Sequence, residues 1–303
     1  MALKTNRIGS LEVTEVGLGC NNFGWRMEEK DSVRVIHAAL DAGINFFDTA
    51  DIYGGTKSEE ILGKALKGKR AVIATKFGME VDAQRKGAKP DYVKRACEDS
   101  LRRLSVDCID LYQLHQPDPS TPIGDTLAAL DDLVKAGKVR EIGCSNFSAA
   151  QLREARQAAK GARFVSVQNQ YSALHRDDEQ EVLPEAARQE LAYLPFFPLE
   201  SGLLSGKYRK GKEAPEGARL SSGKMAERFR SEAKLLAAEK LRAFAEARGH
   251  TLLELAFGYL LAHKPVASVI AGATKIEQVQ ANAAAATWRL TPEELSEVRR
   301  LAS

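Results

Sequence analysis

Four polar residues near the start of the chain have the side-chain types of a proton-transfer site: Asp48, Tyr53, Lys76 and His115. Asp48, Lys76 and His115 each end a short apolar run, and Tyr53 follows Asp48 in a glycine-rich turn. A carboxylate holds a neighbouring ammonium charged, and an ammonium beside a phenol lowers the phenol pKa from about 10. Such a set can protonate a carbonyl oxygen, with Tyr53 as the donor and His115 orienting the substrate.

Each of the four residues alone also has an ordinary explanation. An aspartate after a strand often caps a helix, a tyrosine in a turn packs, a lysine at a strand end is solvated, and most histidines are structural. Their common position at strand ends changes this balance, because the carboxyl ends of parallel strands meet at one edge of a sheet. We therefore interpret the four as one site.

Alternating apolar patterns predict the elements that must position these residues. We expect a hairpin over residues 3–16 and then strands over residues 15–19, 45–48, 71–76, 109–115, 138–144, 164–167, 191–197 and 265–270. We expect helices over residues 32–42, 58–66, 91–104, 123–136, 148–160, 181–189, 231–248, 251–263, 275–285 and 292–301.

Repeated βα units imply parallel strands with right-handed crossovers, and eight of them predict a (β/α)8 TIM barrel. We expect one domain over residues 1–303. A six-stranded Rossmann sheet fits less well, because no GxGxxG motif follows any of the strands. Residues 202–230 are rich in glycine, lysine and serine without apolar periodicity, which predicts a lid or binding loop.

The overall composition argues against several other functions. Lys+Arg 44 against Asp+Glu 41 gives a net charge of +3, which lacks the basic excess of a nucleic-acid binder. The 4 cysteines and 5 histidines show no metal-ligand spacing, so we expect no metal and find little support for a metal-dependent hydrolase. Without a secretory signal or a long apolar run, we expect a cytoplasmic protein that is not in the membrane.

Longer motifs around these residues resemble those of the aldo-keto reductase family. They comprise residues 45–55 with 58–63, 75–78, 111–115, 142–147, 167–171, 198–199 with 202–208, and 270–275. They follow the family order from the first hairpin to the last helices. The arrangement is most similar to the bacterial branch that also includes the potassium-channel β subunits.

The resemblance implies a (β/α)8 barrel that binds NADPH and reduces aldehydes or ketones. Asp48, Tyr53, Lys76 and His115 match the family's catalytic positions, with Tyr53 as general acid. Ser145, Asn146 and Gln168 match the positions that hold the nicotinamide carboxamide, and Phe196 that of the ring stacked on nicotinamide. The remaining cofactor-binding positions are Pro198, Leu199, Gly202, Leu203, Lys207 and Arg219 for the pyrophosphate segment, and Gly272, Thr274, Lys275, Gln278 and Asn282 for the adenosine phosphate.

Several positions depart from the family pattern. Phe197 stands where serine is common, and Glu200 is bulkier and more acidic than usual, so either could alter how the loop closes over the pyrophosphate. Ala281 replaces a frequent glutamate and Gln278 a frequent arginine, which leaves NADH possible as the cofactor. We favour NADPH because Lys207, Arg219 and Lys275 can reach phosphates.

The substrate pocket is specified only in outline. Asn22 and Trp25 follow the first strand, where we expect them to contact a small-molecule aldehyde or ketone. An alternative function is an NADP(H)-binding regulatory module that acts through a protein partner. The sequence leaves open the physiological carbonyl, the direction of the reaction in the cell and the oligomeric state.

Overall fold

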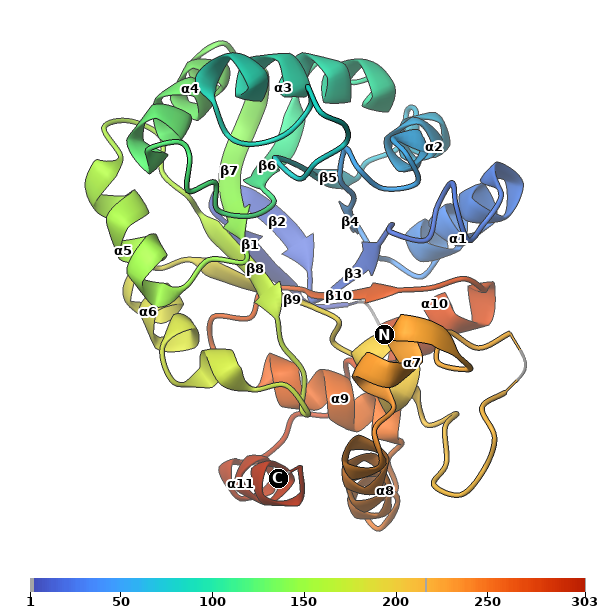
Figure 1. Cartoon of the computed structure of the whole chain (residues 1–303). Coiled ribbons are helices and arrows are strands. Elements are labelled where there is room, and N and C mark those ends of the chain that lie inside the picture. Colours follow the sequence, from blue (N-terminus) through green and yellow to red (C-terminus); the bar gives the residue numbers. More distant parts are fainter. Residues whose placement is uncertain (1–2, 216, 303) are drawn as a thin grey trace.

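Eight parallel strands form a nearly closed barrel in the computed structural model, which describes residues 3–215 and 217–302 (Figure 1). The order of the strands around the barrel is β10-β3-β4-β5-β6-β7-β8-β9. Their bounds are β3 Val16–Gly19, β4 Phe46–Asp48, β5 Val72–Phe77, β6 Ile109–Leu114, β7 Val139–Ser145, β8 Ser166–Gln170, β9 Ala192–Phe196 and β10 Val269–Gly272.

The helices surround this barrel, as Figure 1 shows. They are α1 Glu29–Asp41, α2 Lys57–Leu66, α3 Pro90–Leu104, α4 Ile123–Lys135, α5 Ala149–Ala158, α6 Val182–Arg188, α8 Glu232–Glu246, α9 Leu252–Leu261, α10 Ile276–Ala285 and α11 Pro292–Leu301. Capping boxes at Ser148, Thr251 and Thr291 fix the starts of α5, α9 and α11, because each satisfies two otherwise unpaired backbone N–H groups. The predicted (β/α)8 TIM barrel is confirmed.

The barrel closes between β9 and the stretch just before β10. The amide of Tyr193 donates to the Pro265 carbonyl at 2.7 Å, and the amide of Ala267 donates to the Tyr193 carbonyl at 3.0 Å. β10 itself pairs with β3 on its other side, in the register Val269 with Val16. The stretch predicted as a strand over residues 265–270 therefore pairs with two neighbours: its first residues bond to β9, and its last residues belong to β10, which pairs with β3.

A hairpin closes one end of the barrel, as predicted for residues 3–16. Its strands are β1 Thr5–Ile8 and β2 Leu11–Thr14. Ile8, Leu11 and Val13 are buried and pack against inward-facing barrel residues. This packing fills one end of the barrel, so a ligand is expected at the opposite end, where the strands have their carboxyl ends.

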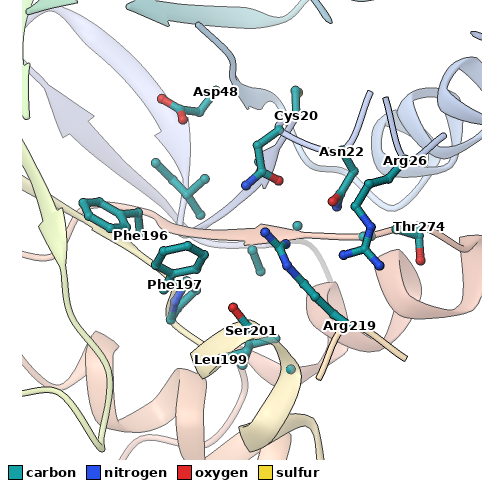
Figure 2. Close-up of a pocket in the computed structure, with 18 of the residues that line it drawn as sticks. Cys20, Asn22, Arg26, Asp48, Phe196, Phe197, Leu199, Ser201, Arg219 and Thr274 are labelled. Carbon is teal, nitrogen blue, oxygen red and sulfur yellow. The ribbon is translucent and has the colours of Figure 1, made fainter. Parts of the chain in front are cut away.

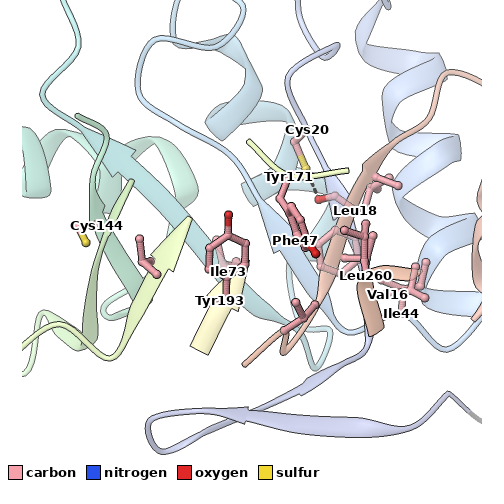
Figure 3. Packing of buried hydrophobic residues seen from close by; sticks show 14 of the residues in the cluster. Val16, Leu18, Cys20, Ile44, Phe47, Ile73, Cys144, Tyr171, Tyr193 and Leu260 are labelled. Atoms are coloured by element: carbon pink, nitrogen blue, oxygen red, sulfur yellow. Dashed lines mark hydrogen bonds between the residues drawn. The ribbon is translucent and has the colours of Figure 1, made fainter. Parts of the chain in front are cut away.

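The larger part of the core lies between the strands and the helices. Figure 3 shows Val16 and Leu18 of β3 and Phe47 of β4 beside Leu260 of α9, all of them buried in one cluster. Phe46 instead belongs to the cluster inside the barrel, because successive side chains of a strand point to opposite faces. Burial of each such side chain contributes about 1.5–3 kcal/mol, so this alternation fixes the register of the strands.

Three regions differ most from the sequence prediction. The last strand was expected over residues 265–270 but is observed as β10 Val269–Gly272. β8 was expected over residues 164–167 but runs from Ser166 to Gln170, because residues 168–170 continue the strand with polar side chains, of which Gln168 lines the cavity. Residues 202–230 were expected to lack regular structure, but they include most of a 3-10 turn, η2 Glu200–Ser205, and a helix, α7 Gly223–Phe229. A further 3-10 turn, η1 Asp177–Glu179, precedes α6. Within residues 3–215 and 217–302, no helix has the length and apolar character needed to cross a membrane.

Candidate active site

A cavity of about 440 Å³ lies at the carboxyl ends of the barrel strands. Most of the predicted site residues line it, namely Asn22, Asp48, Tyr53, His115, Ser145, Asn146, Gln168, Phe196, Pro198, Leu199, Gly202, Lys207, Arg219, Gly272, Thr274 and Gln278. Five predicted residues do not line it: Trp25, Lys76, Leu203, Lys275 and Asn282. Lys76 is fully buried and bound to Asp48, and Trp25 is 63% exposed to solvent.

The polar base of this cavity follows from the pleat of the strands. Phe46, Ala74 and Leu111 point into the barrel, where they pack in one apolar cluster. Because side chains alternate along a strand, the residues two positions later face the same way, and these are Asp48, Lys76 and Gln113. The barrel interior is therefore apolar towards the hairpin and polar at the carboxyl ends of the strands. Gln113 was missed, although its place two residues before His115 is a signal for it.

Asp48 and Lys76 form a buried ion pair in this polar layer. The Lys76 ammonium donates to the Asp48 carboxylate at 2.5 Å and to the Thr49 carbonyl at 3.0 Å. The other carboxylate oxygen of Asp48 accepts from the side-chain amides of Gln168 at 2.9 Å and Gln113 at 3.2 Å. Burial by itself would lower the pKa of Lys76, but Asp48 and then Tyr53 outweigh it, so the pKa is raised and the amine stays charged.

Tyr53 stands beside this ion pair on the turn after β4. The Lys76 ammonium lies 5.4 Å from the centre of the Tyr53 ring. Burial raises the pKa of Tyr53, and Asp48 adds to this, while Lys76 lowers it. The expected influence of Lys76 is present, but burial is larger, so the pKa is raised overall from its ordinary value. The phenol is thus protonated at neutral pH and able to donate.

The turn that carries Tyr53 is held in place by two glycines with left-handed backbone conformations. Gly54 has φ +61 and Gly55 has φ +63. A Cβ at Gly54 would lie 2.3 Å from the Phe23 carbonyl oxygen, whereas a Cβ at Gly55 would meet nothing within 4 Å. The loop after β3, which contains Phe23, therefore rests directly on the loop that carries Tyr53.

This contrast predicts that Gly54→Ala is far more harmful than Gly55→Ala. Both changes strain a left-handed backbone, which costs about 1–2 kcal/mol. Only the Gly54 change also forces two loops apart, which adds about 1–3 kcal/mol and shifts Tyr53. Urea denaturation and kcat for the two variants test this, with Gly55→Ala as the matched control. Equal losses in both variants would show that the contact with Phe23 does not position Tyr53.

His115 completes the polar group at the mouth of the barrel. Its ring meets the Tyr53 ring edge-on, with centres 5.8 Å apart and planes at 81°. Burial, and then the charge on Lys76, lower its pKa to about 3, so the imidazole is neutral at ordinary pH. Its buried Nδ1 has no hydrogen-bond partner among the described residues. His115 lines the cavity, and a neutral imidazole carries one N–H group that can donate to a substrate oxygen.

Ser145, Asn146 and Gln168 form a connected polar wall next to His115. The Ser145 hydroxyl donates to the Gln168 carbonyl at 2.7 Å, and the Asn146 amide donates to the His115 carbonyl at 2.9 Å. Asn146 has φ +62, an uncommon conformation that asparagine tolerates. These contacts fix the orientations of the side chains, so that polar groups with defined directions face the cavity.

The two departures in the segment after β9 have structural explanations. Glu200 is fully buried, and its carboxylate accepts from the Ser172 hydroxyl at 2.8 Å and from the Lys234 ammonium at 2.5 Å. Its charge is thus neutralised there. Phe197 has φ +51 and lines the cavity. The centre of its ring lies 5.8 Å from the Arg219 guanidinium carbon. The phenylalanine therefore gives Arg219 a flat surface to lie against.

The other half of the cavity is bordered by the start of α10 and by cations. The Thr274 amide donates to the Gln278 side chain at 2.8 Å. Lys207 and Arg219 line this half, together with two residues that the sequence reasoning missed, Arg26 and Ser201 (Figure 2). Arg26 follows the first barrel strand, and no pattern in the sequence shows that it faces residues almost two hundred positions away. Across the described part of the chain, no group of three or more His, Cys, Asp or Glu side chains is arranged to hold a metal ion.

Comparison with known proteins agrees with this architecture. A family model described as the aldo/keto reductase family matches residues 15–303. The chain is 38% identical to aldo-keto reductase str7 of Strobilurus tenacellus over 320 residues, which covers 100% of this chain and 93% of that protein.

Two solved structures are also similar. The glycerol dehydrogenase AKR11B4 from Gluconobacter oxydans matches with a TM-score of 0.85 and 34% identity, covering 99% of this chain and 95% of that one. The aldo-keto reductase AKR11C1 from Bacillus halodurans, in its holo form, matches with a TM-score of 0.82 and 34% identity, covering 99% of this chain and 97% of that one. The narrower resemblance to the branch with the potassium-channel β subunits stays a prediction.

Proposed function

The chain belongs to the aldo/keto reductase family and is an oxidoreductase of that type, and from this premise we propose that it reduces aldehydes or ketones to alcohols with NADPH. The observation that carries the proposal is the group formed by Tyr53, the Asp48–Lys76 ion pair and His115 at one end of the barrel. A proton donor, a buried charge next to it and a neutral hydrogen-bonding ring lie together there, and Tyr53 and His115 line the cavity.

Tyr53 acts as the general acid in this proposal. When bound, NADPH supplies a hydride to the carbonyl carbon. Tyr53 gives its proton to the carbonyl oxygen, and the Lys76 ammonium stabilises the phenolate that this transfer leaves. Asp48 keeps Lys76 charged and immobile through their 2.5 Å contact. His115, neutral because its pKa is about 3, orients the carbonyl oxygen without competing as an acid.

The residues around the cavity fit a nicotinamide dinucleotide. Phe196 offers an aromatic face for the nicotinamide, and Ser145 and Asn146 present directed polar groups to its carboxamide. The buried Ser201 hydroxyl and Arg219 Nε have no hydrogen-bond partner among the described residues, so a ligand that supplies acceptors would satisfy both. Phosphate oxygens are such acceptors.

The half of the cavity that the start of α10, Lys207 and Arg219 border is here called the phosphate half. Its positive charge supports the choice of NADPH over NADH. Lys207 and Arg219 border it, and Lys275 lies close enough to lower the pKa of Lys207. Gln278 in place of an arginine and Ala281 in place of a glutamate would weaken the binding of the adenosine part of the cofactor. The three cations that can bind phosphate are still present. The segment over residues 202–230 is proposed to cover the cofactor.

An assay of NADPH oxidation with a panel of aliphatic and aromatic aldehydes and ketones tests the proposed function. We expect oxidation that depends on the carbonyl compound, with kcat on the order of 1 s⁻¹ or higher for the best substrate. NADH in place of NADPH should give a lower kcat/KM. Tight NADPH binding without any carbonyl-dependent turnover would refute the reductase and favour the alternative, a regulatory module that signals through a protein partner.

A further inference from the structure

The phosphate half of the cavity contains a group of cations without acidic partners. Arg26, Lys207 and Arg219 line it, and none of them forms an ion pair with a carboxylate among the described residues. Burial, and then the charge on Arg26, lower the pKa of Arg219. Burial and the charges on Arg26, Lys275 and Arg219 lower the pKa of Lys207. Cations that repel one another in this way are stabilised by an anion between them.

Arg26 reaches this group from the opposite wall. It lies on the loop after β3, whereas Arg219 lies in the segment between η2 and α7. In Figure 2 the Arg26 and Arg219 side chains enter the same part of the cavity from different sides, with Thr274 near Arg26 and Ser201 on the side of Arg219. Asp48 and Phe196 lie at the other end of the same view, so Arg26 belongs to the part of the cavity away from the proton donor.

The loop that carries Arg26 is well fixed. The amides of Arg26 and Met27 both donate to the Asn22 carbonyl at 3.1 Å, and the amide of Gly24 donates to the Met27 carbonyl at 3.1 Å. Phe23 anchors the loop by complete burial of its side chain. The guanidinium is exposed, but the backbone that presents it is held in one conformation, which lowers the entropy lost when it binds a ligand.

We propose that Arg26 is a phosphate ligand of the cofactor, facing Lys207 and Arg219 so that the phosphates are held from both walls of the cavity. The proposal deepens the proposed function and rests on it. It adds to the expected cofactor contacts a residue on the loop after β3. It also offers a compensation for Gln278, which stands where a positive charge is frequent in relatives.

The chemistry of Arg26 suits phosphate better than a carbonyl substrate. A guanidinium has several N–H donors in a planar fork that matches two phosphate oxygens. Ser201 and Arg219 add a buried hydroxyl and a buried N–H that lack partners among the described residues, so donors converge from both sides. An uncharged aldehyde or ketone could not balance the charge of Arg26, Lys207 and Arg219.

Titration of the full-length protein with NADPH and NADH, followed by fluorescence, tests the proposal on Arg26→Gln. We expect Kd for NADPH to rise about tenfold, which is the effect of about 1.4 kcal/mol for one partly solvated charged hydrogen bond. The dependence of Kd on salt should also become weaker, since one charge contact is lost. Arg26→Lys keeps the charge and should recover part of the affinity.

Arg34→Gln provides the matched control. It removes the same charge from an exposed position on α1, outside the cavity, and should leave both Kd values unchanged. An equal rise in Kd for NADPH and NADH in Arg26→Gln would place the contact at the pyrophosphate, and a rise for NADPH alone would place it at the 2′-phosphate. Unchanged Kd for both cofactors would overturn the role of Arg26. Failure of the wild type to bind either cofactor would overturn the proposed function as well.

Discussion

Tyr53→Phe should lower kcat for carbonyl reduction by about 10²–10⁴-fold while changing the affinity for NADPH by less than about twofold. The variant keeps the ring and its edge-on contact with His115, so the shape of the cavity is preserved. Only the hydroxyl is lost, and with it the proton donor that the Asp48–Lys76 ion pair is placed to assist. Steady-state kinetics together with NADPH titration separate the loss of chemistry from any loss of binding.

The dependence of kcat/KM on pH gives a second measurement for the same assignment. Reduction requires the protonated phenol, and burial raises the pKa of Tyr53 from its ordinary value. The wild-type rate should therefore be flat around neutral pH and fall only as the pH rises through this high pKa. His115 adds no change near neutrality, since its pKa is about 3. A fall in rate between about pH 6 and 8 would contradict this division of roles.

Tyr112→Phe is the control for Tyr53→Phe. Tyr112 lies on β6, its ring stacks on Phe77 with centres 4.6 Å apart, and its buried hydroxyl has no partner among the described residues. Removing an unpaired buried hydroxyl is expected to be neutral or slightly stabilising. A kcat for Tyr53→Phe that stays as high as that of Tyr112→Phe would remove Tyr53 from the role of general acid.

Much of the site follows from the sequence because strand ends are visible in it. An apolar run that stops at Asp48, Lys76 or His115 marks both the strand and the edge at which its last side chain lies. The same logic misplaced the end of β8, since Gln168 and Gln170 continue the strand with polar side chains. Apolar periodicity predicts the buried apolar part of a strand, but it does not predict a strand end that carries polar side chains for a site.

Contacts between loops were beyond the reach of sequence patterns. Arg26 faces Arg219 only because the loop after β3 turns back on itself at Gly24, with φ +80, and rests on Gly54. Ser201 meets the cavity because three consecutive residues, 200–202, have positive φ. Backbone conformations of this kind are set by tertiary packing, so no local rule of composition or spacing reveals them.

Lys76→Met should destabilise the protein by about 3–5 kcal/mol and abolish carbonyl reduction. The change leaves the Asp48 carboxylate buried without its cation, which is the costly way to break a buried ion pair. Gln168 and Gln113 continue to donate to that carboxylate, so the protein should still fold, with a lower free energy of unfolding. Urea denaturation and the assay of carbonyl reduction measure the two effects separately.

The double variant Asp48→Asn/Lys76→Met should regain most of the lost stability and none of the activity. Without either charge, the interior no longer contains an unpaired ion. Asp48→Asn alone, in contrast, leaves the Lys76 ammonium buried without a carboxylate partner. The three variants form a double-mutant cycle. Because each single variant should lose about 3–5 kcal/mol and the double variant much less, we expect a coupling free energy of more than about 3 kcal/mol between the two sites. Simple addition of the two single losses would show that the ion pair does not hold this layer together. Because the neutral pair cannot stabilise the Tyr53 phenolate, recovered stability without recovered turnover would separate the structural role of the pair from its role in proton transfer.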